Sequence, residues 1–257
     1  MIKDFTILQF AHSNDKRVTP LNYYKEHVHK YYELIYIING SGRFLIEDVE
    51  YIFEKDSAFL IPPGKYHVMT KLPDKDYERV IVYFSSEHLP PQIENRLYFQ
   101  RACSLANRQL IEKYCNYYTQ FPDEVFKTLL KGFISELILT EFYGNQISNH
   151  EKSYVPPLIK SAIEYINENI DKPLTTKIIA DALFVSNTHL GHVFSSVMNG
   201  GIMHYVQIKK IYKAQELLKK GHTATAVAEM LGYKSYPTFI RNYKTYLGTI
   251  PSQDKIQ

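Results

Sequence analysis

The stretch Val227-Ala228-Glu229-Met230-Leu231-Gly232-Tyr233 decides the fold of the last hundred residues. Its apolar and small residues recur at helical spacing up to a glycine, which predicts a short helix that ends in a tight turn. An earlier stretch, Ile179-Ala180-Asp181-Ala182-Leu183, has the same pattern with alanine at its centre. The chain therefore contains an internal repeat of one small helical unit.

Each copy continues with a second helix that begins at a hydroxyl residue or proline, Ser186 in the first copy and Pro237 in the second. The central alanine allows two helices to cross closely, because a larger side chain would separate them. Apolar residues four apart, Leu190 and Phe194 and then Phe239 and Tyr243, are placed to fill the space between the helices. We interpret the copies as two helix-turn-helix units, at about 175–199 and 223–247.

The two turns differ in sequence. Gly232 supplies the positive φ that the second turn needs. Phe184 occupies the comparable place in the first turn, so we expect that turn to be built differently and to be one residue shorter.

A long helical pattern, Ile202–Lys220, lies between the copies. At the standard rise per residue it forms a helix of about 28 Å, which can hold two units at a fixed separation. Units that face the same side of B-DNA would then enter successive major grooves.

Residues 160–253 resemble the DNA-binding domain of the AraC/XylS regulators. The second unit carries most of the resemblance, and the first contributes further matches: Ala228, Gly232, Tyr233, Phe239, Arg241, Tyr243, Lys244, Gly248 and Pro251, then Ala180, Ser186, Leu190, Phe194, Tyr205 and Ala214. Where the family has a glycine after the first recognition helix, this chain has Asn199, which tolerates the left-handed conformation.

The resemblance implies which side chains face DNA: Thr188, Gly191, His192 and Ser195 in the first recognition helix, and Tyr236, Thr238, Ile240, Arg241 and Lys244 in the second. Arg241 suits a bidentate contact with a guanine edge. Lys244, Lys234 and Lys210 suit phosphates. Gly191 offers no side chain to a base, so the first unit is expected to read fewer bases or to allow close backbone approach.

The first part of the chain has strand-like runs separated by turn signals, namely Tyr32–Ile38, Arg43–Glu47, Ala58–Ile61 and Val80–Phe84. Many short strands at this spacing favour a sandwich or barrel. The predicted fold class is α+β with two domains: an N-terminal cupin-like β-barrel with packed helices, and a C-terminal all-α domain with two helix-turn-helix units joined by a long helix.

The barrel resemblance comes from H-x-H-x₃-E-x₆-G, with His27, His29 and Glu33, followed by P-x-G-x₂-H, which ends at His67. These spacings resemble the two cupin motifs. Three imidazoles and a carboxylate suit a divalent transition metal. Sensor domains of AraC-like regulators resemble cupins and often keep such residues around an organic effector without an ion, so we expect an effector pocket and no metal cofactor. Tyr36, Arg43 and Tyr83 are added as candidate effector-binding residues.

Helical periodicity returns at Leu105–Gln120 and Asp123–Tyr143, and both segments are too apolar to stand free. We expect them to pack on the barrel and to form a homodimer. The predicted domains are 1–147 for effector sensing and dimerisation, 148–156 for a linker, and 157–257 for DNA binding.

The distribution of charged residues supports this division into two domains. Residues 1–152 hold 18 Lys+Arg and 20 Asp+Glu, a net charge of −2, whereas residues 172–257 hold 11 and 4, a net charge of +7. A positive field on one domain suits a polyanionic partner. The two cysteines, Cys103 and Cys115, are too few for a disulfide scaffold, and neither a signal sequence nor a membrane-spanning run is evident, so we expect a cytoplasmic protein.

The sequence thus predicts a transcription regulator, and not an enzyme, that binds double-stranded DNA under the control of a small-molecule effector such as a sugar or other metabolite. RNA polymerase is a further expected partner if the protein is an activator. The alternative is a metal-dependent cupin enzyme fused to a DNA-binding domain.

Overall fold

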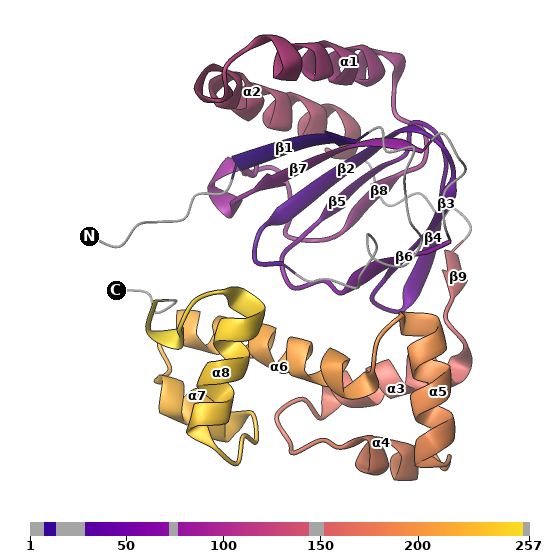
Figure 1. The fold of residues 1–257 in the computed structure, drawn as a ribbon, viewed down its shortest axis with the longest axis vertical. Coiled ribbons are helices and arrows are strands. Elements are labelled where there is room, and N and C mark those ends of the chain that lie inside the picture. The colour runs from indigo at the N-terminus through magenta and orange to yellow at the C-terminus, as the bar shows by residue number, and fades with distance from the viewer. Residues whose placement is uncertain (1–7, 14–28, 72–76, 144–151, 254–257) are drawn as a thin grey trace.

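The structure, a computed structural model, describes residues 8–13, 29–71, 77–143 and 152–253 (Figure 1). A domain of strands with two covering helices lies above a domain made of helices. The strands are β1 Leu8–Ser13, β2 Tyr32–Asn39, β3 Gly42–Ile46, β4 Val49–Phe53, β5 Ala58–Ile61, β6 His67–Lys71, β7 Glu78–Phe84, β8 Tyr98–Gln100 and β9 Lys152–Tyr154.

The strands form two antiparallel sheets, with orders β1-β7-β2-β5-β8 and β6-β3-β4-β9. Side chains alternate across each strand, so β2 buries Ile35 and Ile37 between the sheets and turns Leu34 and Tyr36 to the other face. The inner core includes Phe44 and many other aromatic residues. This arrangement confirms the cupin-like barrel.

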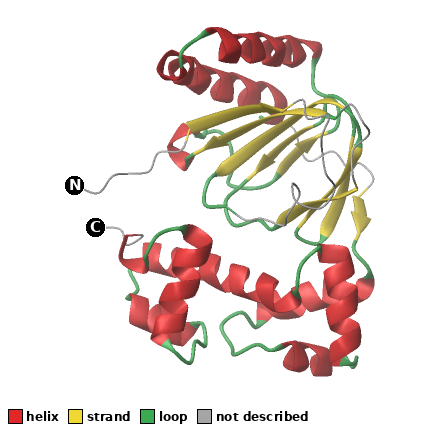
Figure 2. Cartoon of the chain, viewed as in Figure 1, coloured by secondary structure: helices red, strands yellow, loops and turns green. Residues whose placement is uncertain are grey.

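Two helices, α1 Leu105–Gln120 and α2 Asp123–Phe142, cover the outer face of the five-stranded sheet (Figure 2). Their apolar faces pack on that sheet, with Leu130, Phe133 and Leu137 fully buried. The expected packing of these helices on the barrel is therefore confirmed. No helix in the described part of the chain is long and apolar enough to cross a membrane.

The helical domain contains α3 Pro157–Glu168, α4 Thr176–Ala182, α5 Asn187–Met198, α6 Ile202–Lys219, α7 Ala224–Met230 and α8 Tyr236–Leu247. Short 3₁₀ turns occur at Ser86–His88 and Pro251–Gln253. The segment that we assigned to a linker, 148–156, contains β9, which pairs with β4. Residues 148–151 lie outside the described residues. The chain therefore enters the helical domain from the edge of the barrel.

Each helix-turn-helix unit has the predicted core. Ala180 and Ala228, which lie where the helices cross, are 1% and 3% exposed. Phe194 and Phe239 are fully buried between α4 and α5 and between α7 and α8, in separate clusters. Asn199 adopts a φ of 54° and ends α5 in the left-handed conformation, as expected.

The expectation that the first turn is built differently is wrong. Phe184 adopts a φ of 57°, close to the 68° of Gly232. The hydrogen bonds also correspond, from Phe184 N to Asp181 O and from Gly232 N to Glu229 O. The first turn is one residue shorter, because four residues separate α4 from α5 and five separate α7 from α8. The first turn therefore holds a phenylalanine in the left-handed conformation, at an energetic cost that glycine would not have.

Replacing Phe184 with glycine should therefore stabilise the protein. The left-handed conformation costs a non-glycine residue about 1–2 kcal/mol, part of which the entropy of glycine cancels. Phe184 is 96% exposed, so little packing is lost. We expect a gain of about 1 kcal/mol and a rise of several degrees, about 4 °C or more, in the melting temperature of the helical domain. Phe184→Ala is the control, because it removes the ring and keeps the strain; an equal rise in both variants would contradict the explanation.

Candidate functional site

The first candidate DNA-reading surface lies on α5. Ser186 caps the helix, its Oγ accepting from His189 N at 3.1 Å. Thr188, His192 and Ser195 are exposed along the helix. Gly191 is partly exposed, and a Cβ built on it would meet nothing within 4 Å. The predicted residues of the first unit are thus accessible, and space for close backbone approach is present at Gly191.

The second candidate surface lies on α8 and the turn before it. Lys234, Tyr236, Arg241 and Lys244 are exposed. Thr238 is partly buried, as is Ile240, which packs against the core of the second unit. The structure therefore leaves the basic residues of α8 accessible and gives Ile240 a packing role as well.

Lys210 does not lie on either surface. Its side chain is buried, and Nζ donates hydrogen bonds to the backbone oxygens of Lys172 and Leu231. Burial lowers the pKa of this ammonium group. The prediction that Lys210 contacts a phosphate is wrong, because the two carbonyls hold the charge inside the helical domain.

Lys210 instead fixes the two units to each other. Leu231 begins the turn of the second unit, whereas Lys172 belongs to the segment that leads into the first. The neighbouring Gly232 lies so close to this segment that a Cβ on it would be 2.9 Å from Pro173 N. The separation of the reading surfaces therefore depends on this junction as well as on α6.

Inside the barrel, His29, Glu33 and His67 form a buried cluster. His29 Nε2 and His67 Nε2 lie 2.8 Å and 2.9 Å from Glu33 Oε2. The Nδ1 atoms face the carbonyl oxygens of Tyr31 and Lys65 at 2.7 Å and 2.8 Å. A carbonyl only accepts, so each Nδ1 carries a hydrogen.

This geometry limits what the cluster can bind. Each Nε2 contacts Glu33 either as a protonated donor to the carboxylate or through its lone pair, which then needs a proton on Glu33 or a shared metal ion. Three potential ligand atoms within 4.8 Å of one another can also hold a metal ion. The donor set, with carbonyls fixing each Nδ1, is the arrangement that metal-binding histidines adopt.

Comparison with known proteins covers both domains. A family model described as an AraC-like ligand binding domain matches residues 17–141, and a model described as a helix-turn-helix domain matches residues 179–255. The chain belongs to the AraC family. It is a DNA-binding transcription regulator with an N-terminal ligand-binding domain.

Several known proteins are similar to this AraC-family chain over all or part of its length. The HTH-type transcriptional regulator YfiF of Bacillus subtilis is 23% identical over 88% of this chain and 76% of its own length. The multiple antibiotic resistance protein MarA of Salmonella typhimurium is 25% identical over 38% of this chain and 78% of its own length. Among solved structures, ToxT from Vibrio cholerae covers 96% of this chain and 93% of its own, with 14% identity and a TM-score of 0.39.

The other residues that we assigned to the effector site divide into two groups. Tyr83 lies beside the cluster, with its ring 6.0 Å from that of His29, and burial together with the charge of Glu33 raises its pKa. Tyr36 lies on the opposite face of β2 and donates to Asp56 Oδ1 at 2.7 Å. Arg43 is half-exposed on β3 and pairs with Glu50. Tyr36 and Arg43 therefore do not join the cluster, and His27 lies outside the described residues.

Sequence reasoning missed two tyrosines near the cluster. Tyr31 stacks on His29, with ring centroids 4.6 Å apart and 6° between the planes. Tyr212, from α6, has a buried hydroxyl with no hydrogen-bond partner among the described residues, and burial raises its pKa. The abundance of tyrosine, 22 in the chain, hid both residues, because no spacing distinguishes them from the rest.

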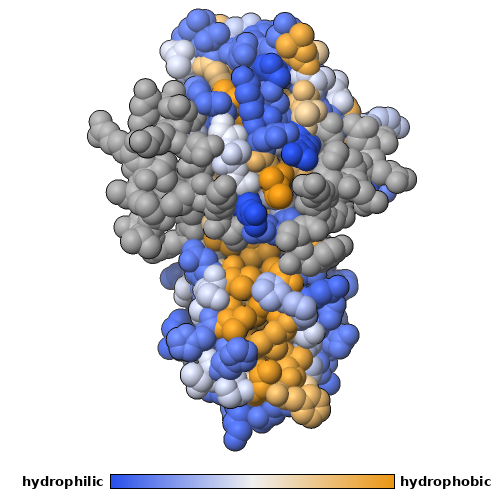
Figure 3. All heavy atoms as spheres, turned by 90° about the vertical axis from the view of Figure 1, so that its right-hand side faces the viewer, coloured by the Kyte–Doolittle hydropathy of each residue, from blue (hydrophilic) through white to orange (hydrophobic). Residues whose placement is uncertain are grey.

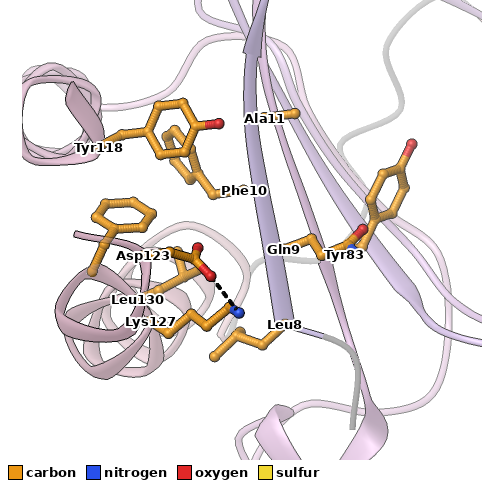
Figure 4. A pocket seen from close by; sticks show the side chains of 10 residues that line it. Leu8, Gln9, Phe10, Ala11, Tyr83, Tyr118, Asp123, Lys127 and Leu130 are labelled. Atoms are coloured by element: carbon orange, nitrogen blue, oxygen red, sulfur yellow. Dashed lines mark ion pairs between the residues drawn. The ribbon is translucent and has the colours of Figure 1, made fainter. Parts of the chain in front are cut away.

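A separate pocket of about 250 Å³ lies between β1 and the α1–α2 pair (Figure 4). Phe10, Tyr118 and Leu130 line it, and the Asp123–Lys127 ion pair lies beside it. Phe10 belongs to the outer core of the five-stranded sheet. Tyr83, which lies beside the His29–Glu33–His67 cluster, also lines the pocket, so the pocket reaches around the edge strand β1.

The environment of both cysteines is that of structural thiols. They are free thiols, Cys103 buried and Cys115 half-buried. Burial raises the pKa of Cys115 to about 12 and raises that of Cys103 as well. Neither thiol is activated as a nucleophile, since the thiolate is the reactive form.

Proposed function

We propose that a small-molecule effector, such as a sugar or other metabolite, binds in the barrel beside His29, Glu33 and His67 and modulates DNA binding by α5 and α8. The observation that carries the proposal is the cluster itself: three buried polar side chains in a core that is otherwise apolar and aromatic. Buried polar groups are costly unless they are hydrogen-bonded, and ligand sites combine an apolar wall with a few placed polar groups.

On this proposal the protein acts in the cytoplasm as a regulator and not as an enzyme. Its further partners are a second copy, through α1 and α2, and RNA polymerase if it is an activator. Exposed apolar residues support the dimer: Leu105, Tyr118, Phe121 and Val125 are 64%, 42%, 40% and 46% exposed.

Footprinting on genomic fragments tests the proposal. Purified protein should protect specific fragments, and defined pools of sugars and metabolites should change that protection. In His67→Ala the change should disappear while basal affinity stays nearly the same, because an effector acts only through its differential affinity for two states. A response that survives in His67→Ala would contradict the assignment of the cluster.

A divalent transition metal is the second candidate occupant, which the donor geometry of the cluster favours. His29 Nε2, His67 Nε2 and Glu33 would hold the ion, which would add positive charge to the barrel core. Elemental analysis separates the two candidates. We expect no stoichiometric metal in protein purified without added metal; about one ion per chain, with a loss of thermal stability on chelation, would favour the metal instead.

A further inference from the structure

The barrel contacts only part of the helical domain. One apolar cluster contains residues of α3, α4, α5 and α6 together with three barrel residues: Leu45 of β3, Tyr66 of the loop before β6, and Val68 of β6. The cluster of the second unit contains no barrel residue. Contact with the barrel therefore falls on the first reading unit and on α6.

Tyr66 makes the most specific of these contacts. Its hydroxyl donates to the carbonyl oxygen of Met198 at 2.6 Å. Met198 is the last residue of α5, where helix carbonyls lack partners within the helix. The Tyr66 ring also packs edge-on against Tyr205 of α6, with centroids 5.2 Å apart. A barrel residue thus completes the end of the first recognition helix.

Glu47 holds Tyr66 and α6 together. It accepts from Tyr66 N through Oε1 at 2.9 Å, and from Lys209 Nζ and Tyr205 Oη through Oε2 at 3.0 Å and 3.2 Å. Glu47 adopts a φ of 56°, a strained conformation for a non-glycine residue. One carboxylate therefore joins the barrel loop to two residues of the connecting helix.

The same loop reaches the buried cluster. His67 follows Tyr66, so a side chain buried in the barrel core and a side chain packed against the helical domain are neighbours in the sequence. Gly64 N donates to His29 O at 3.0 Å, and a Cβ on Gly64 would be 3.0 Å from the Tyr212 ring of α6. Residues 62–67 thus contact the cluster on one side and α5 and α6 on the other.

We infer that Tyr66 and Glu47 form a latch through which the state of the His29–Glu33–His67 cluster controls the first reading unit. A displacement of the His67 backbone is passed to Tyr66, because consecutive Cα atoms are held about 3.8 Å apart. That movement changes the hydrogen bond to Met198 and the position of α5. The latch deepens the proposed function and rests on it; Tyr66 and Glu47 are positioning residues and do not touch DNA.

Hydrogen–deuterium exchange in the full-length protein tests the latch without an effector. Glu33→Gln perturbs the cluster and keeps its size. It should speed exchange of amides at residues 196–206, the end of α5 and the start of α6, by about threefold or more. In a Tyr66→Phe background, where the bond to Met198 is already lost, Glu33→Gln should add little. An equal effect in both backgrounds, or none in the wild-type background, would overturn the inference.

Two control variants separate the latch from general loosening. Tyr114→Phe removes another phenol that donates to a helix carbonyl, that of Leu129 in the α1–α2 pair, and should leave the effect of Glu33→Gln intact. Lys209→Gln should, like Tyr66→Phe, remove most of the effect of Glu33→Gln on amide exchange. Lys213→Gln, which loses an ion pair with Glu216 on the same helix, should not. If Lys213→Gln reduced the effect of Glu33→Gln as much as Lys209→Gln did, the latch would be rejected.

DNA binding provides the second readout. On a duplex selected from random sequence by the wild-type protein, Glu33→Gln should change Kd by about threefold or more in the wild-type background and much less in Tyr66→Phe. Footprints should change over the half-site read by α5 and not over that read by α8; equal changes over both would overturn the latch. Failure of the wild-type protein to respond to any metabolite pool would refute the proposed function alone, because the exchange experiment judges the latch independently.

Discussion

Arg241→Ala should lose discrimination at one or two base pairs, by about 5–150-fold, which corresponds to about 1–3 kcal/mol. Arg241 is exposed on α8, and a guanidinium can bond both acceptors of a guanine edge. Binding to substituted duplexes, measured by fluorescence anisotropy, would show the loss as a reduced preference at those positions. Affinity for unrelated DNA should change much less.

Lys244→Ala is the matched comparison on the same helix. An ammonium that contacts a phosphate weakens all sequences alike, and its loss should flatten the slope of log K against log salt by about one unit. Lys213→Ala, on α6 and paired with Glu216, should change neither quantity. If Arg241→Ala and Lys244→Ala gave equal losses on every duplex, Arg241 would contact only the phosphate backbone.

The helical domain was predictable because its signals are local. Helical spacing, the small alanines at 180 and 228 and the capping residue Ser186 specify each unit within about twenty residues. The predicted units, at about 175–199 and 223–247, agree with α4–α5 and α7–α8, and the predicted long helix Ile202–Lys220 agrees with α6, to within one residue at each end. Strand runs were also visible, but β9 was not, because its pairing with β4 joins residues about a hundred positions apart.

Site residues were predictable only where their face of a strand was fixed. Glu33 and Tyr36 are three residues apart on β2, so the alternation of a strand places them on opposite faces, and the sequence could have excluded Tyr36. Lys210 gave no such signal. Its burial depends on carbonyls from Lys172 and Leu231, which no spacing brings together. The ion pair between Glu47 and Lys209 is non-local for the same reason.

Whether a turn can carry an exposed apolar residue also depends on contacts between residues that are distant in the sequence. Figure 3, which views the molecule from the side of α5, shows apolar residues gathered along the helical domain. Phe184 contributes a nearly fully exposed ring to this domain in a strained turn. The equivalent turn of the second unit cannot carry such a residue, because Lys172 and Pro173 lie against Gly232. The junction between the units, which the sequence does not reveal, therefore decides which turn needs glycine.

Gly232→Ala should accordingly destabilise the helical domain strongly. The left-handed conformation costs alanine about 1–2 kcal/mol, and crowding in a packed site adds about 1–3 kcal/mol. The new Cβ would lie 2.9 Å from Pro173 N and 3.0 Å from Lys172 C, backbone atoms that cannot rotate away. We expect the melting temperature of this domain, followed by circular dichroism, to fall by about 10 °C or more.

Gly248→Ala separates the cost of the left-handed backbone from the cost of crowding. Gly248 has the same φ of 68° as Gly232, but a Cβ there meets nothing within 4 Å. Gly248→Ala should therefore show only the backbone cost, and the extra loss in Gly232→Ala measures the contact with Lys172 and Pro173. DNA affinity should follow the same order, since this contact helps to fix the distance between the reading surfaces. Equal destabilisation by the two substitutions would show that the junction yields to an added methyl group and does not set that distance.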